Sequence, residues 1–188
     1  SYGPPRVNLL SASYNRLFFI GRSRYAISLG LIMALDYLTV KWLHVMSSQL
    51  LFGTGLGSAF YMFFTNLTGD VRAIAVVTRR VVIADWLFTT PTAILQPLTG
   101  FYLIHLAGMP WTTPWVFWSV LGYGFAGACW LPVVWLQIRM AAMAEKAVRE
   151  NQPLPPRYWR FHALWTALGV PAFVVFVVIF YLMVVKPA

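Results

Sequence analysis

The sequence predicts an all-α polytopic membrane protein, built as an antiparallel bundle of four transmembrane helices. Only 10% of its 188 residues are charged and 60% are hydrophobic, whereas a soluble domain carries about 25% charged residues. Four apolar segments have the roughly 20 residues that an α-helix needs to cross a bilayer. The charged residues lie in blocks between these segments, which is the pattern of a chain that crosses a membrane several times.

The four apolar segments are approximately Lys41–Thr65, Val81–Leu106, Pro114–Ile138 and Ala163–Val185. The third continues past the membrane as a helix, because RMAAMAEKAVRE consists mostly of strong helix formers. The prolines of NQPLPP then end that helix, since proline removes a backbone donor and disfavours helical geometry in the residue before it. The lipid bilayer is therefore the first partner that the sequence predicts.

The loops between these segments predict the orientation. Asn66–Arg80 and Arg139–His162 each carry more Arg and Lys than Asp and Glu, whereas Ala107–Thr113 carries no charge. The positive-inside rule places the two basic loops in the cytoplasm and the uncharged loop outside. The same arrangement explains the net charge of +9 without nucleic acid, because the basic residues form no continuous face or helical stripe.

Residues 1–32 do not fit this orientation. They carry four arginines and no acid, yet the four-helix topology would place them outside. We therefore expect residues 1–32 to be an extension outside the core and residues 33–188 to form the transmembrane domain, with Met33 at its start and Asp36 near a helix N-cap. The alternative is a fifth apolar pass through Tyr25–Leu38, which would put the N-terminus in the cytoplasm.

Two histidines are the candidate ligands of a cofactor. His44 lies about one helical turn inside the outer end of the first segment, and His105 lies about one turn from the outer end of the second. Neighbouring antiparallel helices would bring them to similar depth. This arrangement suits haem b held by two imidazoles, by one imidazole and a different sixth ligand, or alternatively a single metal ion. The other reading is two interfacial histidines that bond headgroups or loop carbonyls.

Three glycines of the first segment fall on two faces. Gly55 shares the side of His44 and would let a flat macrocycle approach the backbone closely. Gly53 and Gly57 form a GxxxG spacing on the opposite side, which is typical of helix packing. We therefore expect that pair to contact another helix, a membrane protein partner or a second copy of the chain.

The second segment is rich in polar residues and prolines. Pro91 and Pro97 each free a backbone carbonyl, and the threonines and glutamine of FTTPTAILQPLTG could bond such groups. Asp85 follows Arg79 and Arg80 closely in sequence. We expect it to form an ion pair at the cytoplasmic interface, with proton uptake as the alternative.

At LLFGTGLGSAFYMFF, DWLFTTP, LQPLTG, ACWLPVVWLQIRM and LPPRYWR, the chain resembles an uncharacterised family of bacterial integral membrane proteins, over about residues 33–187. At KWLH, FTTP and the valine-rich run after Pro171, it more distantly resembles HemJ-type protoporphyrinogen oxidases, with CopD-like membrane domains further off. The HemJ resemblance implies that His44 ligates haem b. The HemJ type also carries an intramembrane lysine in its third span, whereas Pro114–Trp130 contains no basic residue.

These observations lead to three functional hypotheses. The first is a bacterial inner-membrane protein that binds haem b near the outer leaflet through His44, with His105, for electron transfer or a HemJ-like oxidation. The second is a non-enzymatic accessory or assembly subunit, and the third is a small metal-handling transporter. No nucleotide-binding glycine loop, HExxH or nucleophile elbow is present in the sequence, and whether the protein is an enzyme stays open.

Overall fold

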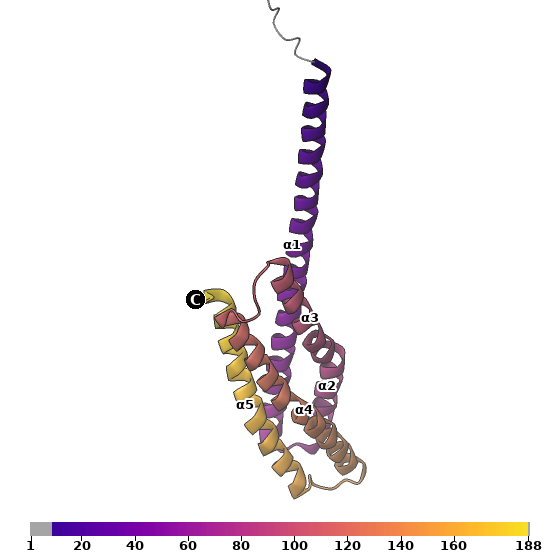
Figure 1. Ribbon diagram of the computed structural model, residues 1–188. Helices are drawn as coiled ribbons and strands as arrows, with labels where there is room; N and C mark the ends of the chain where they lie inside the picture. Colours follow the sequence, from indigo (N-terminus) through magenta and orange to yellow (C-terminus); the bar gives the residue numbers. More distant parts are fainter. Residues whose placement is uncertain (1–8, 188) are drawn as a thin grey trace, which may run out of the picture.

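The computed structural model describes the backbone of residues 9–187 and the side chains of residues 36–187. This part of the chain is helical and contains no strand, so the all-α prediction is confirmed (Figure 1). The elements are α1 (Leu9–Leu67), α2 (Val71–Ala84), the π-helix η1 (Asp85–Thr89), α3 (Thr90–Leu106), α4 (Pro114–Arg149) and α5 (Pro156–Val185).

Three helices of the described part are long and apolar enough to cross a membrane. They are the Asp36–Leu67 part of α1, α4 and α5. The second predicted span is divided between η1 and α3, and neither α2, with 14 residues, nor α3, with 17, reaches a span's length alone. The chain is nevertheless helical without interruption from Val71 to Leu106.

The first helix begins earlier than predicted. Asp36 lies inside α1, which starts at Leu9, so the prediction that Asp36 lies near an N-cap is wrong. The sequence has no proline between Pro5 and Pro91 to stop a helix in this region. The N-terminal part of α1 projects beyond the other helices (Figure 1). Residues 1–8 and the side chains of residues 9–35 lie outside the description, and the domain boundary after residue 32 stays a prediction.

The first basic loop is also shorter than predicted, because residues 71–80 belong to α2. Asp70 is the N-cap of this helix, and its carboxylate accepts hydrogen bonds from the backbone N–H groups of Arg72 and Ala73. Such a cap satisfies donors that the first helical turn leaves free. The buried side chains of α2 are Ile74, Ala75, Thr78 and Val81. Their spacing of three and four residues forms one helical face, which packs against α4.

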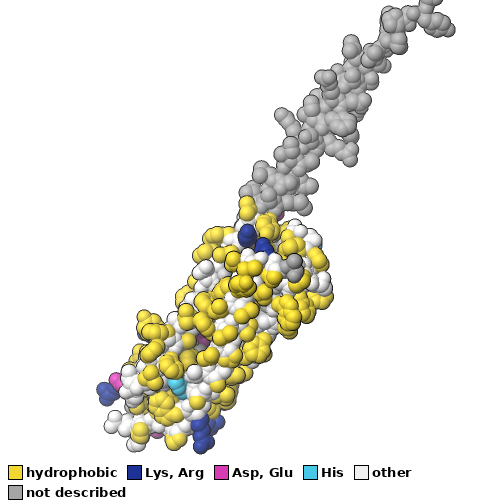
Figure 2. Space-filling view, turned by 90° about the vertical axis from the view of Figure 1, so that its left-hand side faces the viewer, with side chains coloured by type: hydrophobic (Ala, Val, Ile, Leu, Met, Phe, Trp, Pro, Cys, Tyr) yellow, Lys and Arg dark blue, Asp and Glu magenta, His cyan; other side chains and the backbone are white. Residues whose placement is uncertain are grey.

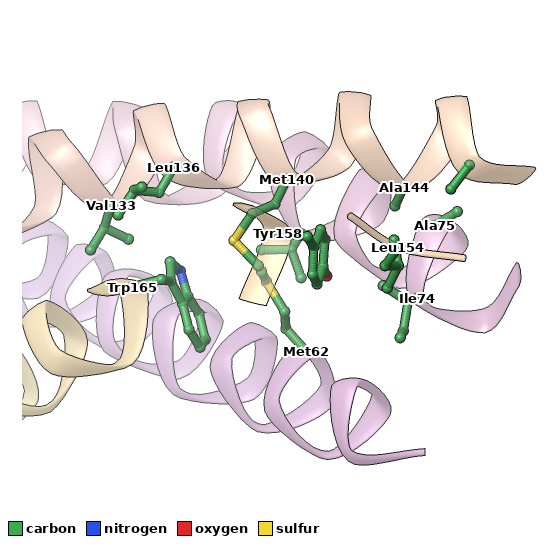
Figure 3. Packing of buried hydrophobic residues seen from close by; sticks show 12 residues of the cluster. Met62, Ile74, Ala75, Val133, Leu136, Met140, Ala144, Leu154, Tyr158 and Trp165 are labelled. Atoms are coloured by element: carbon green, nitrogen blue, oxygen red, sulfur yellow. The ribbon is translucent and has the colours of Figure 1, made fainter. Parts of the chain in front are cut away.

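The hydrophobic core lies at one end of the bundle, near the loops 68–70 and 150–155, which we call the basic end. In Figure 3, Met62 of α1 and Met140 of α4 meet beside the ring of Tyr158, and Trp165 lies near Val133. Met62, Met140 and Tyr158 are each 0% exposed. A polar contact also ties this end together, because the Tyr158 hydroxyl donates to Asn66 Oδ1 at 2.7 Å.

Three pairs of helices make the main packing contacts of the described bundle. α4 and α5 pack as an antiparallel pair, α1 packs against α3, and α2 packs against α4 (Figure 1). Gly122 permits the close approach of α4 and α5, because a Cβ atom at this position would lie 3.1 Å from Val175 and 3.3 Å from Ile179. The core cluster at the basic end joins α1, α2, α4 and α5.

The described surface fits a bilayer environment. The face in Figure 2 is mostly hydrophobic, and Lys and Arg side chains gather at the two ends of the described bundle. Exposed tryptophans lie near both ends, as is typical of the interfaces of a membrane protein: Trp42, Trp111 and Trp118 at one, Trp86, Trp135 and Trp159 towards the other. Trp165, by contrast, packs in the core and is only 6% exposed.

Candidate functional site

His44 lies in a chain of hydrogen bonds between α1 and α3. Its Nδ1 lies 2.8 Å from Thr99 Oγ1, and its Nε2 lies 3.1 Å from Gln96 Nε2. The Ser47 hydroxyl donates to the Gln96 amide oxygen. Thr99 in turn donates its hydroxyl hydrogen to the Leu95 carbonyl at 2.8 Å. Every donor then has an acceptor if His44 is neutral, with the proton on Nδ1 and the lone pair on Nε2.

This chain of bonds leaves His44 with no free ring nitrogen. The Nε2 lone pair accepts from the Gln96 amide, and the Nδ1 hydrogen bonds Thr99. Gly100 makes the close packing possible, because a Cβ atom there would lie 3.2 Å from His44 Cε1. An iron ligand must offer a free lone pair. The arrangement therefore fits a helix–helix contact better than a haem ligand.

The second candidate histidine is not brought to the first. His105 is exposed near the C-terminal end of α3. It follows Gln96 by nine residues, which at 100° per residue places it on the opposite face of α3. No hydrogen bond or ion pair of His105 occurs among the described side chains. The two imidazoles thus do not face a common space, and their joint ligation of haem stays a prediction.

The three glycines of α1 have open surroundings, and one of them lines a cavity. Gly55 lines a cavity, and no atom of another residue lies within 4 Å of a Cβ atom built on it. Gly53 and Gly57 likewise have nothing within 4 Å. The described helices therefore make no close contact at the GxxxG pair. A contact with a second copy or another membrane protein stays a prediction.

A cavity lies between α1, α3, α4 and α5, with residues of η1 in its wall. Its volume is about 690 Å³, within the range of small-molecule sites. Most of its wall is apolar, formed by residues such as Phe52, Phe60, Phe173 and Phe176. Asp85, Thr89, Tyr123, Gln137, Trp130 and Trp165 add polar groups to the wall. The cavity therefore combines an apolar body with a few polar groups.

Asp85 is the charged residue of this wall. Its side chain is only 4% exposed. It accepts hydrogen bonds from the Thr89 hydroxyl at 2.9 Å and from the Gln137 side chain. Among the described side chains no cation pairs with it, and Arg79 instead lies 3.8 Å from Glu145. The predicted ion pair of Asp85 is therefore wrong, because Arg79 and Arg80 lie on the exposed side of α2 whereas Asp85 faces inward.

Three polar atoms of the cavity wall, unlike the Asp85 carboxylate, have no hydrogen-bond partner in the described structure. They are Trp130 Nε1, Gln137 Oε1 and Trp165 Nε1, and all three are buried. Leaving a buried donor or acceptor unpaired costs about 1–3 kcal/mol. Such groups in a wall are what a bound molecule with complementary polar atoms would satisfy.

A π-helical turn and two prolines shape this part of the site. The widened turn η1 ends at Thr89, two residues before Pro91, which has no N–H to donate. The Thr90 N–H bonds the Asp85 carbonyl, five residues back, as in a π-helix. Pro97 frees the carbonyl of Ala93, which accepts from the Tyr123 hydroxyl at 2.6 Å. The donor is therefore a tyrosine of α4, and not one of the threonines or the glutamine that the sequence suggested for this carbonyl.

The sequence offers one signal for this site that the predictions did not use. Ile74, Thr78, Val81, Asp85, Thr89, Thr92, Gln96 and Thr99 recur every three or four residues, and all of them are buried except the half-buried Gln96. A repeat of this kind marks one face of a helix. It would have predicted that Asp85 faces the bundle, together with the partners of His44.

Haem b does not fit the residues as they are arranged. The described residues that form the wall of the cavity include no His, Cys or Met, and the lone pair of His44 Nε2 is engaged by Gln96. Among residues 36–187, no group of three or more His, Cys, Asp or Glu side chains lies close enough to hold a metal ion. Of the three residues predicted to contact haem, Gly55 has open space above its Cα atom, which would admit a flat ligand.

Comparison with known proteins supports the membrane assignment. The profile of a family described as "Predicted integral membrane protein (DUF2269)" matches residues 38–187. No curated protein and no solved structure matches the chain. The more distant resemblance to HemJ-type oxidases and CopD-like domains thus stays a prediction.

Proposed function

The chain belongs to this family of integral membrane proteins, and on that premise we propose that it binds a largely apolar small molecule within the bilayer. The observation that carries the proposal is the cavity of about 690 Å³ between α1, α3, α4 and α5. Its wall is mostly apolar, and Trp130, Gln137 and Trp165 each present a buried polar atom that has no partner in the described part of the chain. A preformed apolar cavity with few polar groups is typical of a ligand site.

The proposal includes a topology of four crossings. α1, α4 and α5 supply three, and the uninterrupted helical run from Val71 to Leu106 supplies the fourth. η1 and Pro91 widen this run without ending it. The loops 68–70 and 150–155 then share one side, which the neighbouring arginines make the cytoplasmic side. The bacterial inner membrane is the location that we propose.

The cavity can be filled without disturbing the backbone. Gly127 on α4 lines it, and no atom lies within 4 Å of a Cβ atom at this position. Gly124, one turn away, has the same open surroundings but lies outside the wall. Gly127→Leu should therefore occupy the ligand's space, whereas Gly124→Leu is a matched control for the loss of a helical glycine.

Native mass spectrometry of the purified full chain tests the proposal. We expect the wild-type protein and Gly124→Leu to retain a non-covalently bound molecule, and Gly127→Leu to lose most of it. Gly55→Leu, which fills the same cavity from α1, should act like Gly127→Leu. Equal retention by all four proteins, or no bound mass in any of them, would refute binding in this cavity.

The optical spectrum tests the haem hypothesis separately. Because Gln96 and Thr99 engage both ring nitrogens of His44, we expect protein expressed with ample haem to show no Soret band that depends on this residue. A band that disappears in His44→Ala would show that the imidazole exchanges a hydrogen bond for iron. The accessory-subunit and metal-handling hypotheses stay predictions, which co-purification and metal analysis would test.

A further inference from the structure

The acceptor groups around Asp85 indicate what kind of molecule the cavity takes. We infer that the ligand is an amphiphile with a hydrogen-bond-donating cationic head, such as an alkylammonium, whose head lies against Asp85 and Gln137 and whose chain fills the apolar part. This inference rests on the proposed function, because it assigns the chemistry of a ligand in the same cavity.

Asp85 is placed to attract a cation. The residue lines the cavity and is only 4% exposed, and among residues 36–187 it has no ion-pair partner. A carboxylate removed from water is stabilised chiefly by an opposite charge and by hydrogen bonds. Thr89 and Gln137 supply two hydrogen bonds. The opposite charge is what the described protein does not supply.

The free capacity at this point of the wall is that of an acceptor. A carboxylate offers about four lone-pair sites, and among residues 36–187 only two donors reach Asp85. Gln137 Oε1 is also buried and has no partner among the same residues. A head with several N–H groups would donate to the free acceptor atoms of both Asp85 and Gln137. An anionic head would instead place two like charges together in a medium of low dielectric.

The rest of the wall accommodates the chain of an amphiphile. Tyr123, Trp130 and Gln137 recur every seven residues on one face of α4 and all line the cavity. At 1.5 Å per residue, the distance along α4 from Tyr123 to Gln137 is roughly 21 Å. Phe52, Phe173 and Phe176 form apolar wall along this length. A linear alkyl chain therefore fits in shape and polarity.

Three probes with equal chains separate head charge from chain burial. The purified full chain in detergent would be titrated with dodecylamine, a cation at pH 7, with neutral dodecanol and with anionic dodecanoate, and bound fractions measured by native mass spectrometry. We expect the wild-type protein to bind the amine about tenfold more tightly than the alcohol, a difference of about 1.4 kcal/mol. Dodecanoate should bind the most weakly.

Two variants assign the preference. Asp85→Asn keeps the size of the side chain and removes its charge, so it should bind the amine and the alcohol equally while still binding both. Gly127→Leu should bind neither probe. If Asp85→Asn does not fold, an amine-to-alcohol ratio near one in the wild-type protein still overturns the inference.

The failures are distinguishable. Equal binding of amine and alcohol to the wild-type protein, abolished by Gly127→Leu, would overturn the cationic head and leave the proposed function standing; it would also show that the Asp85 carboxyl is neutral in the cavity. An amine preference that persists in Asp85→Asn would likewise overturn the inference. Binding of all probes to Gly127→Leu at wild-type levels would overturn both.

Discussion

The Tyr123 hydroxyl on α4 donates a hydrogen bond of 2.6 Å to the Ala93 carbonyl oxygen on α3. In a regular helix the N–H of residue 97 would bond this carbonyl, but residue 97 is proline. Pro97 of α3 thus leaves a carbonyl without its helical partner, and a side chain of α4 supplies the missing hydrogen bond. Because Tyr123 also lines the cavity, the bond holds one wall of the site at a fixed distance from another.

Tyr123→Phe should destabilise the protein by about 1 kcal/mol, because it leaves the Ala93 carbonyl without a partner. The effect should shrink in a Pro97→Ala background, where the N–H of residue 97 can bond Ala93 within α3. Unfolding free energies in mixed micelles for the two single variants and the double variant give this coupling. An unchanged cost in the Pro97→Ala background would show that Tyr123 acts through packing alone.

Gly122 should tolerate a methyl group poorly. A Cβ atom at this position would lie 3.1 Å from Val175 and 3.3 Å from Ile179, where α4 and α5 pack together. Gly124→Ala is the matched control, because nothing lies within 4 Å of its Cβ position and the change should gain helix propensity of up to about 1 kcal/mol.

We expect Gly122→Ala to be less stable than Gly124→Ala by at least about 1 kcal/mol, since overpacking opposes the gain in propensity. Thermal unfolding of the two variants in the same detergent measures the difference. Equal melting temperatures would mean that α5 moves away from α4 at no cost.

His44 and His105 should differ in their contributions to stability. His44→Ala removes a side chain that bonds both Gln96 and Thr99, and should lower the free energy of unfolding by about 1–3 kcal/mol. His105→Ala alters an exposed side chain and should change it by less than about 0.5 kcal/mol. The measurement is unfolding of the two variants side by side. A larger loss in His105→Ala would contradict the contact described between α1 and α3.

Length and hydropathy predict most of this fold. The ends of α4 and α5 follow from Pro114, the NQPLPP segment and the apolar run after it, because proline and charge act locally on the helix. The start of α1 did not follow, since an N-cap residue such as Asp36 is a weak signal where no proline stops the helix before it. The sequence did not predict α2 as a helix, because its arginines resemble those of a cytoplasmic loop.

The site was less predictable than the fold. Depth along antiparallel helices places His44 and His105 at similar levels, but it does not give their rotation about the helix axes. The rotation can be inferred from the row of residues that includes Asp85, Gln96 and Thr99, because this row marks the face of the helical run that packs inward. The cavity depends on the distances between α3, α4 and α5. The residue pattern of a single helix does not predict these distances.

Tyr158 should be among the most sensitive residues of the basic end. Its side chain is 0% exposed, and its hydroxyl donates to Asn66 Oδ1 at 2.7 Å. Tyr158→Phe would leave the buried amide oxygen unpaired and should cost about 1–3 kcal/mol in unfolding free energy. In the Asn66→Leu background the same change should cost less, because no acceptor remains. A cost that is equal in both backgrounds would assign the effect to the ring's packing with Met62.

Asp70 tests whether α2 is a helix in its own right. Its carboxylate accepts from the backbone N–H of Arg72 at 2.9 Å and of Ala73 at 3.3 Å, so Asp70→Ala should cost about 1 kcal/mol. Asp70→Asn, which also caps helices well, should retain most of the stability and separates the cap from the charge. Hydrogen exchange at the first turn of α2 reports the local effect, and we expect faster exchange in Asp70→Ala alone. If both variants exchange at the wild-type rate, packing of Ile74 and Ala75 against α4 holds the helix start without its cap.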